Sequence, residues 1–414
     1  MQANTCDTEF DPMALSEEQA RERILAASAA VGETQRLPLL QALGRVLAAS
    51  VEAPFDVPPH RNSAMDGYAL RAADQDTAGR LRIIGRSFAG HPFEGRVDAG
   101  ECVHIMTGAV VPDGADTVVQ QELTTTDDEW LQLQQTLRSG ANIRHPGEDM
   151  RRGQTVLEQG RLLTPADLGL LASLGLGEID VYRLPRVAFF STGDELRGVG
   201  EALREGEIHD SNRYVLHGLL QKLGAEIIDL GRIADRAEDV NDALTKAAAQ
   251  ADVVITTGGA SVGEADYVTR ALRELGQADF WKIAIKPGRP LNFGRIGQAL
   301  FFGLPGNPVS AMATFALFVT PCLRRLRGEA DRPYRVLRAV TRNDLKKSPG
   351  RTDFQRGILH AEQDGGLSVT TTGLQGSHML SSMSRADCFI RLPRESGPVA
   401  AGSAVDVMPF SDLF

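Results

Sequence analysis

The stretch Asp252-Val-Val-Ile-Thr-Thr-Gly-Gly-Ala-Ser-Val-Gly-Glu-Ala-Asp-Tyr267 decides the fold of this chain. Its apolar run Val253 to Ile255 is wholly β-branched, which is typical of a buried parallel strand. Glycines, hydroxyls and the acids Glu264 and Asp266 follow, ahead of a helical pattern that starts at Tyr267. Ligands of open α/β sheets bind outside the carboxyl ends of the strands, so the stretch predicts a phosphate loop with an acid that can hold a cation. On its own it fits an ordinary glycine-rich turn equally well.

The chain around this stretch alternates strands with helices. The expected strands are Val187–Phe190, Ile227–Leu230, Val253–Ile255, Phe280–Ile285 and Ala299–Phe302. The expected helices are Ser211–Leu223, Glu238–Ala249 and Pro308–Leu326, the last with Asn307 as its N-cap. This alternation predicts right-handed βαβ units and therefore an α/β domain with a central parallel sheet, over residues 183–328.

Acidic residues follow three of these strands, as Asp194 and Glu195, as Asp235, and as Glu264 and Asp266. The carboxyl ends of parallel strands meet at one edge, and carboxylates gathered there suit Mg²⁺. Lys282 lies near the end of the next strand, and Lys286 and Arg289 follow it, which favours a phosphorylated ligand or an oxyanion. A salt bridge at the rim explains any single acid, but the convergence of several strand ends favours a site.

Short strands separated by turn residues lie on both sides of the α/β region. Residues 54–147, which begin with a proline-rich connector, predict a small β-rich domain, and residues 332–414 predict a C-terminal β-barrel or sandwich. Near the start, Ser16 with Gln19 forms the capping-box pattern of a helix, and the leucine spacing over Leu39–Leu47 predicts a second helix.

Composition excludes several classes of protein. The chain has 414 residues, 42% of them hydrophobic, 24% charged, and a formal net charge of −10, which argues against nucleic-acid binding. Its four cysteines lie far apart, so neither a zinc ribbon nor a disulfide framework is expected. We see no signal peptide and no uninterrupted apolar run of membrane-spanning length, and we expect a cytoplasmic protein without membrane partners. Neither a Walker A motif nor a Rossmann fingerprint occurs.

Several motifs together resemble one family. They are Asn62-Ser-Ala-Met-Asp-Gly-Tyr68, Met106-Thr-Gly108, Ser191-Thr-Gly-Asp-Glu-Leu196, Thr257-Gly-Gly-Ala-Ser-Val-Gly-Glu-Ala-Asp-Tyr267, Lys286-Pro-Gly288, Gly303-Leu-Pro-Gly-Asn-Pro-Val309, Phe354-Gln-Arg-Gly357 and Gly376-Ser-His378. In this order they resemble the molybdopterin molybdenumtransferases (MoeA, and the E domain of gephyrin). The resemblance implies a multidomain α/β plus β fold, in which residues 1–53 and 148–182 form an elongated linking and dimerisation domain.

The resemblance implies insertion of molybdate into adenylylated molybdopterin with Mg²⁺, releasing AMP and molybdenum cofactor. The residues it assigns to the chemistry are Glu195, Asp235, Asp266, Lys282, Lys286, Asp66, Thr107 and Asp149, with Glu195, Asp235 and Asp266 at the metal. The residues it assigns to ligand binding are Thr192, Gly193, Asp194, Gly258, Gly259, Ser261, Gly263, Pro305, Asn307, Pro308, Arg356 and Ser377. It implies a homodimer in which the small β domain faces the sheet crevice of the other subunit, and it allows contacts with the adenylyltransferase and with cofactor-receiving enzymes.

The chain departs from the family pattern in two places. His60-Arg61 stands where Phe-Asp is usual, and Arg289 stands where a lysine is common, a change that keeps the charge but not the same donor. Two other functions remain as alternatives. A gephyrin-like scaffold would not need the acids and lysines, and a molybdopterin adenylyltransferase would not need the additional domains on both sides.

Overall fold

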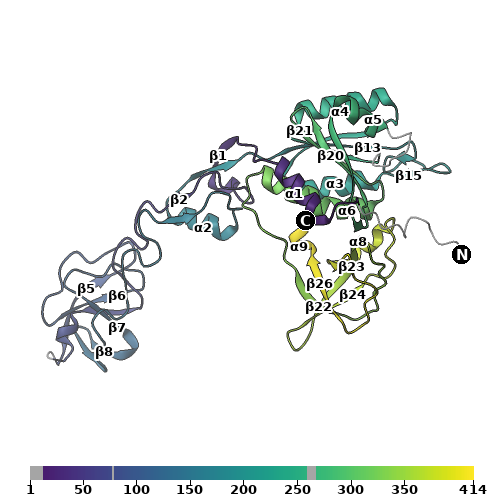
Figure 1. Cartoon of the computed structure of the whole chain (residues 1–414). Helices are drawn as coiled ribbons and strands as arrows, with labels where there is room; N and C mark the ends of the chain where they lie inside the picture. Colours follow the sequence, from purple (N-terminus) through teal and green to yellow (C-terminus); the bar gives the residue numbers. More distant parts are fainter. Residues whose placement is uncertain (1–12, 77–78, 259–266) are drawn as a thin grey trace. The chain divides into compact units, whose positions relative to one another are not determined.

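The computed structural model describes residues 13–76, 79–258 and 267–414, which form two compact units (Figure 1). The larger unit comprises residues 1–48, 160–164 and 178–414, and the smaller unit comprises residues 49–159 and 165–177. The four domain boundaries expected from the sequence stay a prediction.

A six-stranded sheet forms the centre of the larger unit, in the order β16-β13-β17-β21-β20-β18. Its strands are β13 (Arg186–Thr192), β16 (Glu226–Ile233), β17 (Val253–Thr257), β18 (Gly276–Lys282), β20 (Pro290–Ile296) and β21 (Ala299–Leu304). Side chains alternate between the two faces of each strand, so both faces of these apolar strands need a cover.

Helices cover both faces of the sheet (Figure 1). Val187 and Phe189 pack with α3 (Ser211–Lys222) and with the long helical segment of α6 (Pro308–Thr314), a π-helical turn (Phe315–Val319) and α7 (Thr320–Leu326). Ala188 and Phe190 pack with α4 (Ala237–Gln250) and α5 (Tyr267–Leu275). The doubly covered α/β domain expected from the sequence is confirmed.

The sheet is mixed rather than wholly parallel, which corrects one expectation. β20 is antiparallel to both of its neighbours, β18 and β21, and the sequence did not predict it. Two successive reversals leave β18 running in the same direction as β13, β17 and β21. The carboxyl end of β18, at Lys282, therefore still lies at the edge where the parallel strands end.

A closed barrel follows the α/β domain, as expected. Its strands β22 (Leu337–Thr341), β23 (Thr352–Ala361), β24 (Leu367–Thr371), β25 (Cys388–Leu392) and β26 (Ala404–Pro409) close because β23 pairs with both β24 and β25. Two short helices accompany it, α8 (Leu380–Arg385) and α9 (Phe410–Leu413). A two-residue strand of the α/β domain, β19 (Ile285–Lys286), pairs in parallel with β23 and thus joins the barrel sheet.

The N-terminal part of the larger unit consists of α1 (Glu17–Ala27), a 3-10 turn (Leu39–Gln41) and the antiparallel pair β1 (Thr34–Pro38) and β12 (Glu178–Tyr182). The Ser16–Gln19 capping box is present, with Gln19 N donating to Ser16 Oγ over 3.2 Å. The helix predicted over Leu39–Leu47 is wrong. Leu40 and Leu43 are exposed, and Gly44 takes a φ of 71° that ends the turn.

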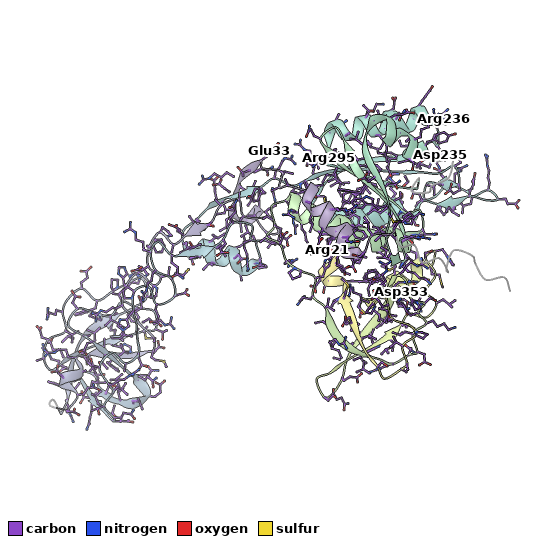
Figure 2. The ribbon with its side chains drawn as sticks, in the orientation of Figure 1. Arg21, Glu33, Asp235, Arg236, Arg295 and Asp353 are labelled. Carbon is purple, nitrogen blue, oxygen red and sulfur yellow. The ribbon has the colours of Figure 1, made fainter. Side chains whose placement is uncertain are left out.

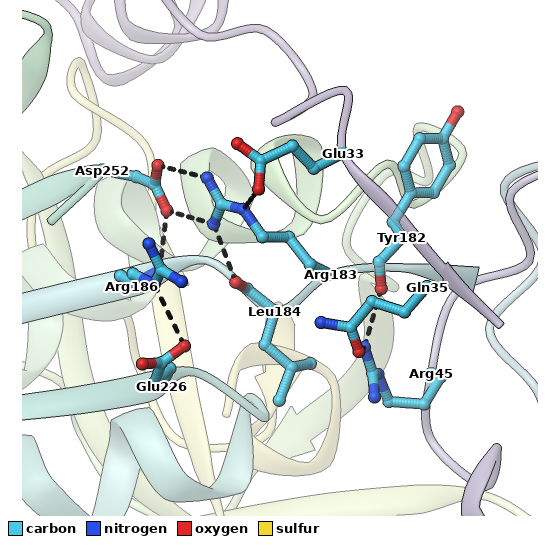
Figure 3. Close-up of polar contacts among 9 residues, drawn as sticks. All are labelled: Glu33, Gln35, Arg45, Tyr182, Arg183, Leu184, Arg186, Glu226 and Asp252. Carbon is cyan, nitrogen blue, oxygen red and sulfur yellow. Dashed lines mark hydrogen bonds and ion pairs between the residues drawn. The ribbon is translucent and has the colours of Figure 1, made fainter. Parts of the chain in front are cut away.

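Arg183 ties this N-terminal part to the start of the central sheet (Figure 3). Its guanidinium donates to both carboxylate oxygens of Asp252 over 2.7 and 2.8 Å, and its Nε donates to Glu33 over 2.7 Å. Arg186 N donates to the same Asp252 carboxylate over 2.7 Å. Because Arg186 opens β13 and Asp252 precedes β17, these bonds hold the two strand starts together, at the end of the sheet opposite the predicted site.

The smaller unit contains a six-stranded sheet in the order β7-β4-β6-β5-β9-β8, as the short-strand pattern predicts. Its strands are β4 (Gly67–Leu70), β5 (Leu81–Ser87), β6 (Glu101–Ile105), β7 (Thr117–Gln120), β8 (Thr124–Asp127) and β9 (Trp130–Leu133). Outside this sheet lie two short pairs, β2 (Val51–Glu52) with β11 (Thr155–Leu157) and β3 (Asn62–Ser63) with β10 (Ile143–Arg144), and helix α2 (Pro165–Ser173).

One helical segment, Pro308–Leu326, is long and apolar enough to cross a membrane by length and composition. It is 78% buried inside the protein, between the central sheet, α1 and the barrel side of the larger unit. Its apolar composition is accounted for by this burial, as in the core helix of a globular domain.

Candidate functional site

Two strand ends of the central sheet bring acidic residues together. Thr192 ends β13, and its Oγ1 donates to Asp235 Oδ1, just beyond β16, over 3.2 Å. Burial raises the pKa of Asp235, the Thr192 hydrogen bond acts against that rise, and the charges of Asp194 and Glu195 add to it. Asp194 and Glu195 are thus near enough to Asp235 for their charges to act on it. Figure 2 shows where Asp235 lies.

In the turn after β13 the Glu195 side chain folds back over Gly193. A Cβ on this glycine would lie 2.7 Å from Glu195 Oε2, at the flexible end of that side chain. Arg197 Nη1 donates to Asp194 O over 2.9 Å and holds the same turn from the other side. These two contacts make the turn after β13 compact.

Gly258 follows β17 and is the last described residue before the glycine-rich loop. It has a φ of 89°, and a Cβ there would lie 2.5 Å from Thr192 O. Only glycine meets both conditions without a shift of the backbone. The remaining residues predicted in this stretch, which are Gly259, Ser261, Gly263 and Asp266, lie outside the described residues.

The loop that carries Pro305, Asn307 and Pro308 lies beside Gly258. A Cβ on Gly306 would come within 3.9 Å of Gly258 Cα, and Asn212 Nδ2 donates to Gly306 O over 2.7 Å. Asn307 takes the N-cap position of α6 as predicted, and its carbonyl accepts from Ala311 N over 2.9 Å, although its side chain makes no capping bond. The loop therefore adjoins the acidic strand ends.

The same helix start contacts the barrel. Val309 N, in the first turn of α6, donates to Ser377 O over 3.1 Å. Arg356, on β23, donates from Nη2 to Gly376 O over 3.0 Å and from Nε to Ser382 Oγ over 3.0 Å. The side chain of Arg356 is only 1% exposed, and burial lowers its pKa to about 10 while Asp353 acts in the opposite direction. Arg356 and Ser377 thus lie beside the loop after β21.

The two predicted lysines lie on one short segment that is held from both sides. Leu15 N donates to Lys282 O over 2.9 Å, and Ala284 N donates to Leu15 O over 2.8 Å. On the other side Lys286 is the strand partner of Asp353 in the β19–β23 pair. After Lys286 the chain turns at Gly288, whose Cβ would lie 2.6 Å from Thr314 Cγ2 of α6. Lys286 is therefore fixed near α6, β23 and Arg356.

The smaller unit holds the other predicted residues. Asp66 Oδ1 accepts from both the N and the Oγ1 of Thr107 over 2.7 Å, and these bonds lower the pKa of the exposed Asp66 carboxyl. Asn62 Nδ2 donates to Gly108 O over 2.6 Å, so the Asn62–Tyr68 motif holds the Thr107–Gly108 turn. Asp149 N donates to Val57 O over 3.0 Å, which places Asp149 beside the proline-rich connector.

The two departures from the family pattern have structural counterparts. Arg61 Nη1 donates to Ala115 O over 3.0 Å, so this residue contributes to the packing of the smaller unit. Arg289 O accepts from Ile283 N over 2.8 Å, so its main chain closes the turn that carries Lys286.

Within the part of the chain that the structure describes, no three His, Cys, Asp or Glu side chains lie close enough to share a metal ion. Two of the three predicted ligands, Glu195 and Asp235, are near each other, and the third, Asp266, is outside the described residues. The donors present are all carboxylate oxygens, the ligands that Mg²⁺ prefers.

Sequence reasoning missed two residues of this region. Asn212 holds Gly306, and Asp353 is the strand partner of Lys286. Asn212 had a signal in the sequence, because it is a polar residue in the first turn of an expected helix. Asp353 had no such signal, since only the fold brings β19 beside β23.

Known proteins match nearly the whole chain. Three family models fit it: MoeA N-terminal region (domain I and II) at residues 15–175, probable molybdopterin binding domain at residues 188–325, and MoeA C-terminal region (domain IV) at residues 338–410. The molybdopterin molybdenumtransferase of Haemophilus influenzae is 44% identical over 402 residues, which cover 96% of this chain and 99% of that protein. Gephyrin of Dictyostelium discoideum is 31% identical over 90% of this chain and 59% of its own length.

A solved structure shows the same architecture. The crystal structure of the molybdopterin biosynthesis moeA protein from Pyrococcus horikoshii OT3 matches with a TM-score of 0.84 and 29% identity, over 96% of this chain and all of that one. The chain therefore belongs to the molybdopterin molybdenumtransferase (MoeA) family.

Proposed function

We propose that this chain inserts molybdate into adenylylated molybdopterin, releasing AMP and molybdenum cofactor in a Mg²⁺-dependent reaction. The observation that carries the proposal is the position of the loop after β21. Gly306 adjoins Gly258 at the acidic strand ends, while Val309 binds Ser377 beside Arg356 on the barrel. One loop thus connects an acidic region suited to a cation with a basic region suited to an oxyanion.

The acidic region would hold the metal and the adenylate end of the substrate. Asp235 and Glu195, together with Asp266, would hold Mg²⁺, whose charge would offset the burial and the repulsion that raise the pKa of Asp235. When bound, Mg²⁺ polarises a phosphoryl group and screens its charge. Gly258 allows the main chain after β17 to approach a phosphate closely.

The basic region would bind molybdate. Lys286 and Arg356 lie on the neighbouring strands β19 and β23, and Ser377 lies next to Gly376, whose carbonyl fixes the Arg356 guanidinium. A buried guanidinium that is already hydrogen-bonded loses little freedom when an oxyanion binds. Lys282, the last residue of β18, would offset the charge of the substrate phosphates.

The reaction can be tested by measuring molybdate-dependent AMP release from adenylylated molybdopterin. We expect Asp235→Ala to abolish release, and we expect Asp239→Ala, which removes an exposed acid of α4 paired with Arg236, to leave it unchanged. A chain that binds the substrate yet releases no AMP would be a scaffold. A chain that forms the adenylate from ATP would be an adenylyltransferase. Either result would refute the proposal.

We further propose that the chain acts as a homodimer, with Asp66 and Thr107 of one copy completing the site of the other. Asp66→Ala and Asp235→Ala should each be inactive alone. Random mixing of the two variants makes half of the dimers mixed, each with one intact site, so activity should return to about a quarter of the wild-type value. No recovery after mixing, with exchange of subunits verified, would contradict a shared site.

The cytoplasm is the proposed location. Cys102, Cys322 and Cys388 are free and buried, and burial raises the pKa of the Cys102 and Cys322 thiols to about 12. Thiols of this kind are unreactive packing residues and place no demand on an oxidising compartment. Expression of the chain with a fluorescent tag, followed by fractionation, would test the location.

A further inference from the structure

A buried acid lies within the basic region and has no role in the proposed chemistry. Asp353 is on β23, is only 7% exposed, and is the strand partner of Lys286 on β19. Figure 2 shows it at the end of the barrel that adjoins the α/β domain. A carboxylate at this depth costs free energy unless charges or hydrogen bonds compensate it, so its position calls for a physical explanation.

Positive charge surrounds Asp353 on several elements. The charges of Lys286 on β19, Arg356 on the same strand and Lys347 on the segment before β23 all act on it. Lys347 is itself held by the carbonyls of Ser348 and Arg351, over 2.9 and 2.7 Å, and is 7% exposed. Among the described residues, three cations thus act on one carboxylate, an excess of positive charge that suits an oxyanion such as molybdate.

Two further neighbours of Asp353 among the described residues, Gln355 and Leu392, carry no charge. Gln355 Nε2 donates to Asp353 Oδ2 over 3.1 Å and to Lys346 O over 2.8 Å, so the amide anchors the carboxylate. On β25 the strand partner of Asp353 is Leu392, an apolar residue. Burial raises the pKa of Asp353, and the Gln355 hydrogen bond and the nearby cations act against that rise.

We propose that Asp353 is a positioning residue that orients Lys286, its strand partner, for an oxyanion, and that takes up a proton when the oxyanion binds. The inference rests on the proposed function, because it assumes that molybdate occupies the basic region. Without ligand the carboxylate attracts Lys286, which lies opposite it on β19. With ligand Lys286 contacts the dianion, and the Asp353 carboxylate then lies beside a second negatively charged group.

The direction of the pH dependence follows from this arrangement. A dianion beside Asp353 favours the protonated carboxyl, so the pKa of Asp353 is higher with ligand than without. Binding therefore takes up a proton between the two pKa values, and the affinity falls as the pH rises across that window. For one coupled proton the slope is at most about tenfold per pH unit.

The test measures oxyanion binding to the full-length protein by calorimetry between about pH 5 and about pH 8. Molybdate and sulfate serve as two separate probes, and buffers of different ionisation enthalpy report the proton taken up. We expect the wild-type affinity to fall as the pH rises, with proton uptake. Asp353→Asn should bind more tightly at the upper end of the range, with no proton uptake, because a negative charge next to the ligand is gone.

Two further variants keep the result interpretable. Asp353→Glu should restore the pH dependence, which a loss of packing alone would not predict. Asp364→Asn removes an exposed acid at the β23–β24 turn of the same barrel and should match the wild type. A wild-type affinity independent of pH, or an Asp353→Asn variant that keeps the wild-type pH profile, would overturn the inference.

The test also separates this inference from the proposed function. If molybdate-dependent AMP release is normal but binding shows no linked proton, the function stands and the role of Asp353 falls. If the wild type neither binds molybdate nor releases AMP, both fall together. The wild-type measurements need no variant, so a misfolded Asp353→Asn protein would not block the decision.

Discussion

Gly258→Ala is the most direct perturbation of the site, because the structure fixes two separate costs. At a φ of 89°, an alanine pays about 1–2 kcal/mol for a left-handed backbone. Its Cβ would also lie 2.5 Å from Thr192 O, and relieving such an overlap costs about 1–3 kcal/mol more. We therefore expect a loss of about 2–5 kcal/mol in the free energy of unfolding, or a shift of the loop away from β13 that abolishes activity.

Gly402→Ala is the matched control for this variant. Gly402 has a φ of 85°, and a Cβ on it would meet nothing within 4 Å. It therefore carries the backbone cost without the overlap. Urea unfolding of both variants, in a Trp130→Phe background, can be followed by the fluorescence of Trp281, which is buried against Phe293 in the larger unit. Equal destabilisation of the two variants, with AMP release intact in both, would refute the close approach of Gly258 to Thr192.

Two further predictions concern stability. Asp252→Ala leaves the buried Arg183 without its bidentate partner and should lower the free energy of unfolding by about 2–4 kcal/mol, measured by urea titration. Burial acts to raise the pKa of Asp252, but its bonds to Arg183 and Arg186 lower the pKa overall. This stabilisation is therefore complete above the unfolded-state pKa of about 4 and is lost as the pH falls through the folded-state pKa. If the Asp252→Ala variant unfolds in acid with the same curve as the wild type, this prediction is wrong. Ser16→Ala should cost about 1 kcal/mol through loss of the capping box, and Ser16→Asp should largely restore it.

The sequence predicts those parts of the fold in which local pattern and final environment agree. β17 was predicted because a fully buried strand tolerates only apolar and β-branched residues, and α1 was predicted from its capping box. β20 was missed because Pro290 and Gly294 interrupt its pattern, although β18 and β21 pair with it. The helix expected over Leu39–Leu47 failed because spacing alone does not show which leucines are buried.

The candidate site divides in the same way. The acids after β13 and β16 were predicted together because parallel strands end at one edge, a rule that needs no knowledge of side-chain packing. The environment of Arg356 and Asp353 depends on a pair of strands, β19 and β23, that are far apart in the chain. Such long-range pairing leaves no periodic signal in the sequence, so the buried charges around Lys286 became apparent only in the folded protein.

The β19–β23 pair has a consequence for how the chain can be divided. Lys286 belongs by sequence to the α/β domain, yet its main chain is a strand of the barrel sheet, and Thr352 N donates to Ala284 O over 2.8 Å beside it. A fragment that stops at Leu326 would keep every α/β residue but expose an unpaired strand edge, which invites association with other chains. Lys286 and Asp353 are therefore strand partners only when the α/β domain and the barrel are present in one chain.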